Sequence, residues 1–193
     1  MDATQKLHDL GQSLWLDNLT RGLLTGGTLR RYLHEFSVTG LTSNPTIFDH
    51  AIRNSHDYDN AIRQKLKEGK SGEALFFELA LEDLRQAADL FRPIHDQTNG
   101  MDGWVSLEVS PLLANDTAGT IAAATELYAR AERPNLFIKI PGTKVLTKFA
   151  EVGIDTDALA GQLQKEGAKS FVKSWNELME CITSKSETLK KAS

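Results

Sequence analysis

Segments with strand and helix patterns alternate through the first three quarters of the 193-residue sequence. This order is typical of parallel strands that are joined by crossover helices. We therefore expect an α/β protein with about four parallel strands. The strand candidates are SLWLDNL (13–19), VTGLTSNP (38–45), GWVSLEVSP (103–111) and LFIKIPG (136–142).

Helical patterns fill the stretches between the strand candidates and continue to the end of the chain. In 72–92, apolar residues recur at the spacing of an amphipathic helix that packs on a sheet. No run with a period of two residues follows Lys144, so we expect a helical tail, whose polar residues 184–193 should fray. The other predicted helices span 28–36, 46–55, 57–68 and 119–131.

Composition and charge narrow the class of protein. A hydrophobic content of 40% is enough for an ordinary core. A net charge of −4 argues against nucleic acid as a partner but allows small anionic substrates. The opening residues lack a signal-peptide pattern and no long apolar run occurs, so we expect a cytoplasmic protein without a membrane partner. One cysteine, Cys181, excludes an internal disulfide, and the five histidines lack metal-ligand spacing.

One lysine stands inside a strand candidate. Lys139 lies between Ile138 and Ile140 in a run that is otherwise typical of a buried strand. Desolvating a lysine is costly unless its amine is paired or gives up its proton. The sequence therefore predicts that this amine has a partner or a chemical use.

Side-chain direction alternates along a strand, so positions two residues apart share a face. In 103–111, Ser106, Glu108 and Ser110 share one face and apolar residues share the other, which predicts a polar inner face. Each strand candidate carries a polar or ionisable residue near its C-terminal end, where parallel α/β proteins assemble active sites. These residues are Asp17, Asn44, Glu108 and Lys139.

The four side chains suit Schiff-base chemistry. A lysine amine in a partly desolvated site, as we expect for Lys139, loses its proton more easily and can attack a carbonyl to form an iminium that acts as an electron sink. Two carboxylates in different surroundings, Asp17 and Glu108, divide the proton transfers that form the iminium and break the adjacent carbon–carbon bond. Asn44 and Thr42 would orient substrate hydroxyls by hydrogen bonds.

Each of these residues also has a structural interpretation when it is taken alone. A lysine at a strand end is commonly a solvated residue. Glu108 and Asp17 could be helix caps or ion-pair partners, and Asn44-Pro45 is itself a turn and helix-start signal. The joint placement of the four at matching strand ends favours the chemical interpretation.

Several motifs resemble bacterial transaldolases: SLWLDNLTRGLL, GLTSNPTIF, VSLEVSPLLANDT and LFIKIPGTK. The stretch FAEVGIDTDALAGQLQKEGAKSFVKSWNELM is similar to the C-terminal end of the same proteins. The resemblance implies a class I Schiff-base enzyme on a (β/α)8 TIM barrel. Such an enzyme moves a dihydroxyacetone unit from sedoheptulose 7-phosphate to glyceraldehyde 3-phosphate, giving erythrose 4-phosphate and fructose 6-phosphate, in the pentose phosphate pathway. The resemblance also implies that the enzyme needs no metal and no organic cofactor.

The resemblance also implies a role for each candidate residue. Lys139 would be the Schiff-base lysine, and Asp17 the acid/base that helps to cleave and form the carbon–carbon bond. Glu108 would work with a water at the carbinolamine stage. Thr42 and Asn44 match the TSNP segment, in which the asparagine binds the dihydroxyacetone moiety.

A barrel of this type needs about 250 residues and eight strands, twice the number of strand candidates here. By the resemblance, the fifth to eighth strands are missing between Lys144 and Val145, with the family's later threonine, serine and arginine site residues. We therefore expect an incomplete barrel, with residues 1–144 as its N-terminal half and 145–193 as a C-terminal helical segment of the same domain. Its unpaired sheet edges would favour a homo-oligomer.

Two other functions stay open. The chain could be a fructose 6-phosphate aldolase-like enzyme that needs no phosphorylated aldose acceptor. It could also be a non-catalytic truncated homologue that serves as an assembly fragment. Both enzyme functions predict sugar phosphates as the partners, whereas the fragment predicts no chemistry at all.

Overall fold

Four parallel strands form one sheet in the computed structural model, which describes residues 3–140 and 156–191. The strands follow one another across the sheet in chain order, β1-β2-β3-β4. Each parallel connection crosses over the sheet through helices, as this topology requires. The expected α/β class and the incomplete barrel of about four parallel strands are confirmed. The strands are β1 (Leu14–Asp17), β2 (Val38–Thr42), β3 (Trp104–Glu108) and β4 (Leu136–Lys139).

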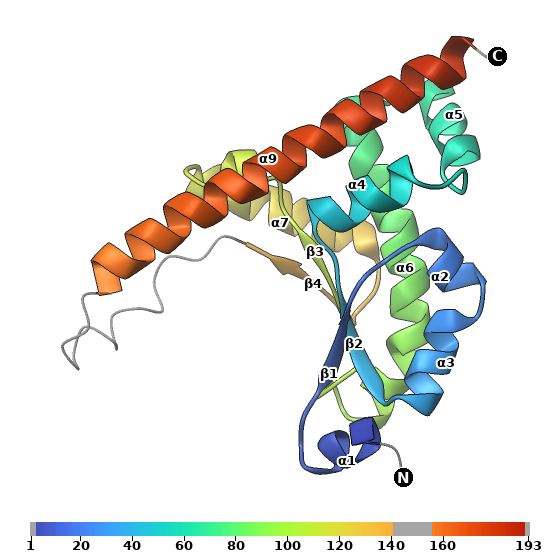
Figure 1. Ribbon diagram of the computed structural model, residues 1–193, viewed down its shortest axis with the longest axis vertical. Coiled ribbons are helices and arrows are strands. Elements are labelled where there is room, and N and C mark those ends of the chain that lie inside the picture. The colour runs from blue at the N-terminus through green and yellow to red at the C-terminus, as the bar shows by residue number, and fades with distance from the viewer. Residues whose placement is uncertain (1–2, 141–155, 192–193) are drawn as a thin grey trace.

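Helices make up most of the remaining described chain (Figure 1). The predicted helices over 57–68 and 72–92 are confirmed as a pair, and the predicted helical tail is a single long helix. The first two helices do not follow from the sequence pattern. The elements are α1 (Ala3–Asp9), α2 (Arg21–Thr25), α3 (Thr28–Glu35), α4 (Pro45–Arg53), α5 (Asp59–Lys67), α6 (Gly72–Gln97), the short 3-10 helix η1 (Pro111–Leu113), α7 (Thr117–Ala131) and α9 (Thr156–Lys191).

The core lies between the sheet and α6, which runs along one of its faces (Figure 1). Val105 and Leu107 of β3 are almost completely buried there. Leu84 and Ala87 of the apolar α6 stripe are fully buried. Each large aliphatic side chain that is removed from water in this way contributes about 1.5–3 kcal/mol. The alternation of apolar residues in β3 therefore fixes which face of the sheet the helices cover.

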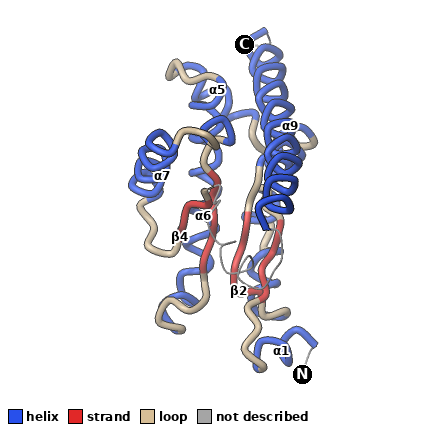
Figure 2. Tube along the Cα trace, turned by 90° about the vertical axis from the view of Figure 1, so that its left-hand side faces the viewer, coloured by secondary structure: helices blue, strands red, loops and turns tan. Residues whose placement is uncertain are grey.

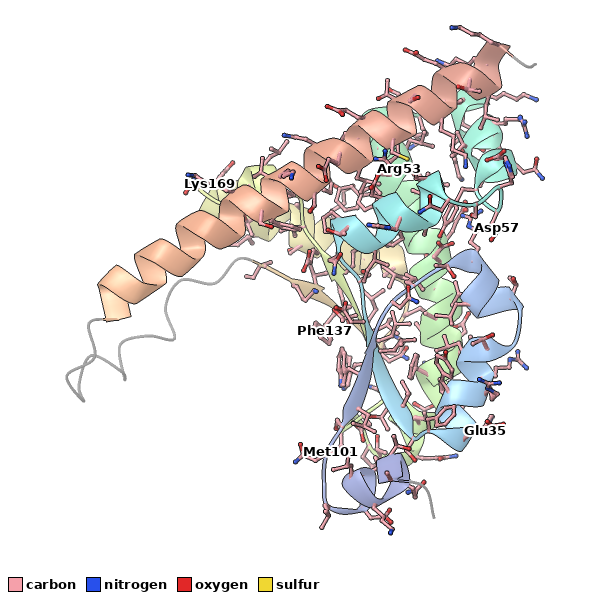
Figure 3. The ribbon with its side chains drawn as sticks, viewed as in Figure 1. Glu35, Arg53, Asp57, Met101, Phe137 and Lys169 are labelled. Atoms are coloured by element: carbon pink, nitrogen blue, oxygen red, sulfur yellow. The ribbon has the colours of Figure 1, made fainter. Side chains whose placement is uncertain are left out.

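The opposite face of the sheet, which we call the open face, is on the side turned toward the viewer in Figure 2. This face carries aromatic rings. The rings of Trp15 and Phe137 lie 5.7 Å apart, and those of Phe137 and Trp104 lie 6.0 Å apart. Trp15 keeps 39% of its surface exposed, and Phe137 is labelled on this face in Figure 3. The Trp15 ring lies against Gly40, where a Cβ atom would come within 2.4 Å of it. Gly40 is therefore required by the close approach of this ring.

The register of the strands confirms the predicted faces. Inner residues pair with inner residues in each of the three strand pairs, so the polar positions stay on the open face. One row of paired residues across the sheet consists of Asp17, Thr42, Ser106 and Phe137. Two residues further along β3 and β4, and on the same face, Glu108 pairs with Lys139.

Helix α9 crosses the upper end of the molecule in Figure 1 and packs mainly against α4, α5 and α6. Trp175, Ile182 and Leu189 are buried against these helices. The expected fraying of residues 184–193 is wrong for the described part, because α9 continues to Lys191. The boundary expected between residues 1–144 and 145–193 lies outside the described residues. This polar tail is therefore part of a helix with one buried side.

A contact of the half-buried Lys185 holds the C-terminal half of α9. Lys185 Nζ donates to the backbone carbonyls of Ile52, at 2.7 Å, and of Ser55. It also forms an ion pair with Asp59 at 2.9 Å. Because the carbonyls belong to the last turn of α4 and the loop after it, Lys185 satisfies acceptors that a helix end leaves unpaired.

Acid is expected to weaken this anchor. Burial opposes the charge of Asp59, but Lys185 and His56 more than offset it and lower its pKa. A lowered pKa stabilises the fold above the unfolded-state value of about 3.9, and this contribution is lost as pH falls through the native value. We expect Asp59→Asn to cost about 0.5–1 kcal/mol at neutral pH and to make stability less sensitive to acid.

Urea unfolding between neutral pH and pH values below the unfolded-state pKa measures this effect. Asp57→Asn is the matched control, because Asp57 is a neighbouring exposed acid that lies outside the Lys185 contact. A pH dependence of Asp59→Asn as steep as that of the wild type would show that the anchor does not depend on the Asp59 charge.

Candidate active site

Lys139 and Glu108 form an ion pair at the C-terminal end of β3 and β4. The two residues are opposite each other in the strand register, and the distance between Lys139 Nζ and Glu108 Oε1 is 2.7 Å. Their side chains are 33% and 22% exposed, so the pair is accessible from the open face. The lysine that stands inside a strand thus has a partner, as the sequence predicts.

Two further acceptors from β2 and the loop that follows it complete the surroundings of the amine. Lys139 Nζ donates to Thr42 Oγ1 at 2.9 Å and to the backbone carbonyl of Ser43 at 3.0 Å. An ammonium group has three protons to donate, and Glu108, Thr42 and Ser43 provide three acceptors. The amine is therefore held in a defined position, with a carboxylate in place to receive a proton.

Ser106 lies beneath this group and orients Thr42. Its hydroxyl donates to Thr42 Oγ1 at 3.0 Å, and the side chain of Ser43 donates to the Ser106 carbonyl at 2.9 Å. Ser106 is completely buried. Side-chain alternation predicts Ser106 on the inner face but gives no sign of Ser43, because a contact through a backbone carbonyl leaves no signal in the side-chain pattern.

The second carboxylate oxygen of Glu108 is free for another contact. Oε2 is buried, and no group in the described part of the chain donates to it. A buried carboxylate oxygen normally has a hydrogen-bond donor. The oxygen is therefore available to a water or a substrate hydroxyl, while Oε1 holds Lys139.

The other two candidate residues form no hydrogen bond or ion pair with Lys139 or Glu108 within the described part of the chain. Asp17 is exposed at the end of β1, opposite Thr42 in the register. Three strand spacings of about 4.8 Å separate its strand from that of Lys139. Asn44 is the N-cap of α4, and its Oδ1 accepts from the backbone N–H of Ile47 at 2.9 Å. The helix-start interpretation of Asn44 is confirmed, which leaves its amide nitrogen for a substrate.

The described residues contain no group of three or more histidine, cysteine or acidic side chains placed to hold a metal ion. In the same part of the chain, no helix has the length and apolar character that crossing a membrane requires.

Replacing Thr42 by valine is expected to destabilise the fold by about 1–3 kcal/mol, because it leaves the buried Ser106 hydroxyl without its acceptor. In a Ser106→Ala background the same replacement should cost clearly less, since both polar partners are then gone. Urea unfolding of the four proteins in this double-mutant cycle gives the coupling energy. Equal costs in the two backgrounds would contradict the contact.

Known proteins resemble this chain over the part that contains the candidate residues. A family model described as Transaldolase/Fructose-6-phosphate aldolase matches residues 14–148, which include all five candidate residues. A transaldolase of Arthrobacter sp. (strain FB24) is 49% identical over 140 residues, which are 72% of this chain and 38% of the relative. A transaldolase of Thiobacillus denitrificans is 44% identical over 143 residues, 74% of this chain and 40% of the relative. The matched part thus spans about two fifths of the length of these relatives.

Proposed function

The chain belongs to the transaldolase/fructose-6-phosphate aldolase family, and from this premise we propose that it forms a Schiff base between Lys139 and a ketose phosphate. The observation that carries the proposal is the position of the Lys139 amine, 2.7 Å from Glu108 Oε1 and held by Thr42 and Ser43. Such pairing of a nucleophile with a proton acceptor is the geometry that covalent catalysis needs.

The proposed first stage uses Lys139 and Glu108. The ammonium passes a proton to Glu108 Oε1, and the free amine attacks the C2 carbonyl of the ketose to give a carbinolamine. Glu108 then returns a proton to the carbinolamine hydroxyl, which leaves as water, and the iminium remains on Lys139. The free Oε2 of Glu108 supports this role, because it can hold the departing water.

The proposed second stage breaks the bond between C3 and C4 of the sugar. A base removes the proton of the C4 hydroxyl, an aldose phosphate leaves, and the iminium accepts the electron pair. We assign this base to Asp17 and assign the binding of the dihydroxyacetone hydroxyls to Thr42 and the Asn44 amide. With sedoheptulose 7-phosphate as donor and glyceraldehyde 3-phosphate as acceptor, the products are erythrose 4-phosphate and fructose 6-phosphate, as in the pentose phosphate pathway.

Trapping the iminium tests the proposal. The protein is incubated with fructose 6-phosphate, reduced with borohydride and digested, and the peptides are weighed by mass spectrometry. We expect a dihydroxyacetone-sized addition on the peptide that contains Lys139. A full-length relative that is labelled in parallel while this chain stays unlabelled would overturn the proposal.

Two other functions keep support from specific observations. The family description includes fructose 6-phosphate aldolases, which would release the aldose phosphate without needing a phosphorylated acceptor. A non-catalytic fragment is favoured by the short span of this chain relative to the relatives. Release of free glyceraldehyde 3-phosphate without an acceptor identifies the aldolase, and the absence of any adduct identifies the fragment.

A further inference from the structure

The two outer strands of the sheet each have one edge that no described strand pairs with. β1 pairs only with β2, and β4 pairs only with β3, within residues 3–140 and 156–191. Such an edge presents backbone N–H and carbonyl groups that favour pairing with another strand. α9 packs mainly on α4, α5 and α6, not on the strands (Figures 1 and 2).

The two edge strands end in residues of opposite charge, and the one on β4, Lys139, is also paired with Glu108 of β3. Asp17 ends β1 and is exposed, and Lys139 ends β4. Both side chains are on the open face and at the same, C-terminal end of the parallel sheet. A β1 edge placed beside a β4 edge would therefore bring an acid next to a base, whereas two like edges would bring equal charges together.

The open face also exposes apolar surface beside both edges. Trp15 on β1, the strand at one edge, is 39% exposed. Phe137, which contacts Trp15, is half-buried. Together with the charge pattern, these side chains favour a partner that covers the open face and pairs with both sheet edges.

We propose that two copies of this chain pair edge to edge, with β4 of each copy beside β1 of the other. A two-fold axis parallel to the strands keeps all eight strands parallel and makes the two new strand pairs identical. Eight parallel strands are the number that closes into a barrel whose interior is filled by side chains. Closure places Asp17 of the second copy beside or diagonal to Lys139, within reach of a lysine side chain.

The molar mass in solution tests this pairing. Light scattering after size-exclusion chromatography should give twice the 21.3 kDa of one chain. Asp17→Lys should halve this mass, because the introduced ammonium would face the ammonium of Lys139 in the second copy. Lys139→Glu should halve it for the opposite reason, since the introduced carboxylate would face Asp17 of the second copy as well as Glu108 of its own chain. An equimolar mixture of the two variants should restore the double mass, because one of the two strand pairs then joins the introduced positive and negative side chains and the other keeps the native pair.

Glu187→Lys is the matched control. Glu187 is an exposed acid on α9, away from both edges, and this variant should keep the double mass. Circular dichroism verifies that each variant keeps its helices, and Asp17→Asn, which only removes the charge, replaces any charge reversal that unfolds. A folded wild-type monomer, or a dimer whose mass survives both charge reversals, would overturn the proposal.

This pairing does not rest on the proposed chemistry. The mass is measured without substrate, so a monomer would leave the adduct on Lys139 as a separate question. A dimer that forms no adduct would keep the interface and overturn only the enzyme function. If the dimer and the adduct both form, the Asp17 that assists Lys139 can come from the second copy. The activity of an equimolar mixture of Asp17→Lys and Lys139→Glu, compared with that of each variant alone, then measures this contribution.

Discussion

Replacing Lys139 by arginine is expected to abolish the borohydride-trapped adduct and to lower any transaldolase activity by more than about 10³-fold, the scale of losing a covalent nucleophile. The guanidinium keeps the positive charge beside Glu108 and can still donate to Thr42, so the local fold should survive. It stays protonated at any working pH and cannot attack a carbonyl. Peptide mass spectrometry after reduction, together with a coupled assay for erythrose 4-phosphate, measures both effects.

Lys173→Arg serves as the control for this substitution. Its side chain is 76% exposed on α9 and pairs only loosely with Glu177, at 3.8 Å. This variant should be labelled like the wild type. An adduct that persists in Lys139→Arg would place the reactive amine elsewhere and would leave the Lys139 contacts with a purely structural role.

Trp175→Ala is expected to destabilise the fold by about 3–5 kcal/mol, the cost of deleting a buried aromatic side chain. Trp175 is 2% exposed, and its ring meets Phe76 edge-on at 5.2 Å and Phe77 at 5.9 Å. These contacts join α9 to α6 across a large separation in the sequence. Loss of the indole would leave a cavity that neighbouring rings cannot easily fill.

Urea unfolding followed by circular dichroism measures this cost. Glu177→Ala, on the same helix and 49% exposed at its side chain, should change stability by less than about 0.5 kcal/mol. A cost below about 1 kcal/mol for Trp175→Ala would mean that α9 does not depend on this packing.

The alternation of side chains along the strands predicted much of the candidate site. Glu108 and Lys139 share a face because both positions follow the period of two, and the parallel register then brings them together. Thr42 joins them for the same reason. Periodicity can predict this because a strand has one geometry and its neighbours are fixed by chain order.

Other features lie beyond what a local pattern carries. The strand candidate 38–45 ends at Thr42, because Asn44 caps α4 and Pro45 occupies its first turn. The contact of Lys185 with the end of α4 joins residues 130 positions or more apart, and nothing in the polar tail predicts it. Long-range contacts of single side chains depend on the packing of whole helices.

The ammonium of Lys139 also fastens three strands at their ends. It belongs to β4, and its acceptors are Glu108 at the end of β3 and Thr42 and Ser43 at the end of β2. A Schiff-base nitrogen carries at most one proton, so forming it gives up at least two of these three hydrogen bonds. Formation of a Schiff base would therefore weaken the hydrogen bonds that join the ends of β2, β3 and β4. The amine that would hold the substrate is the same group that holds these strand ends together.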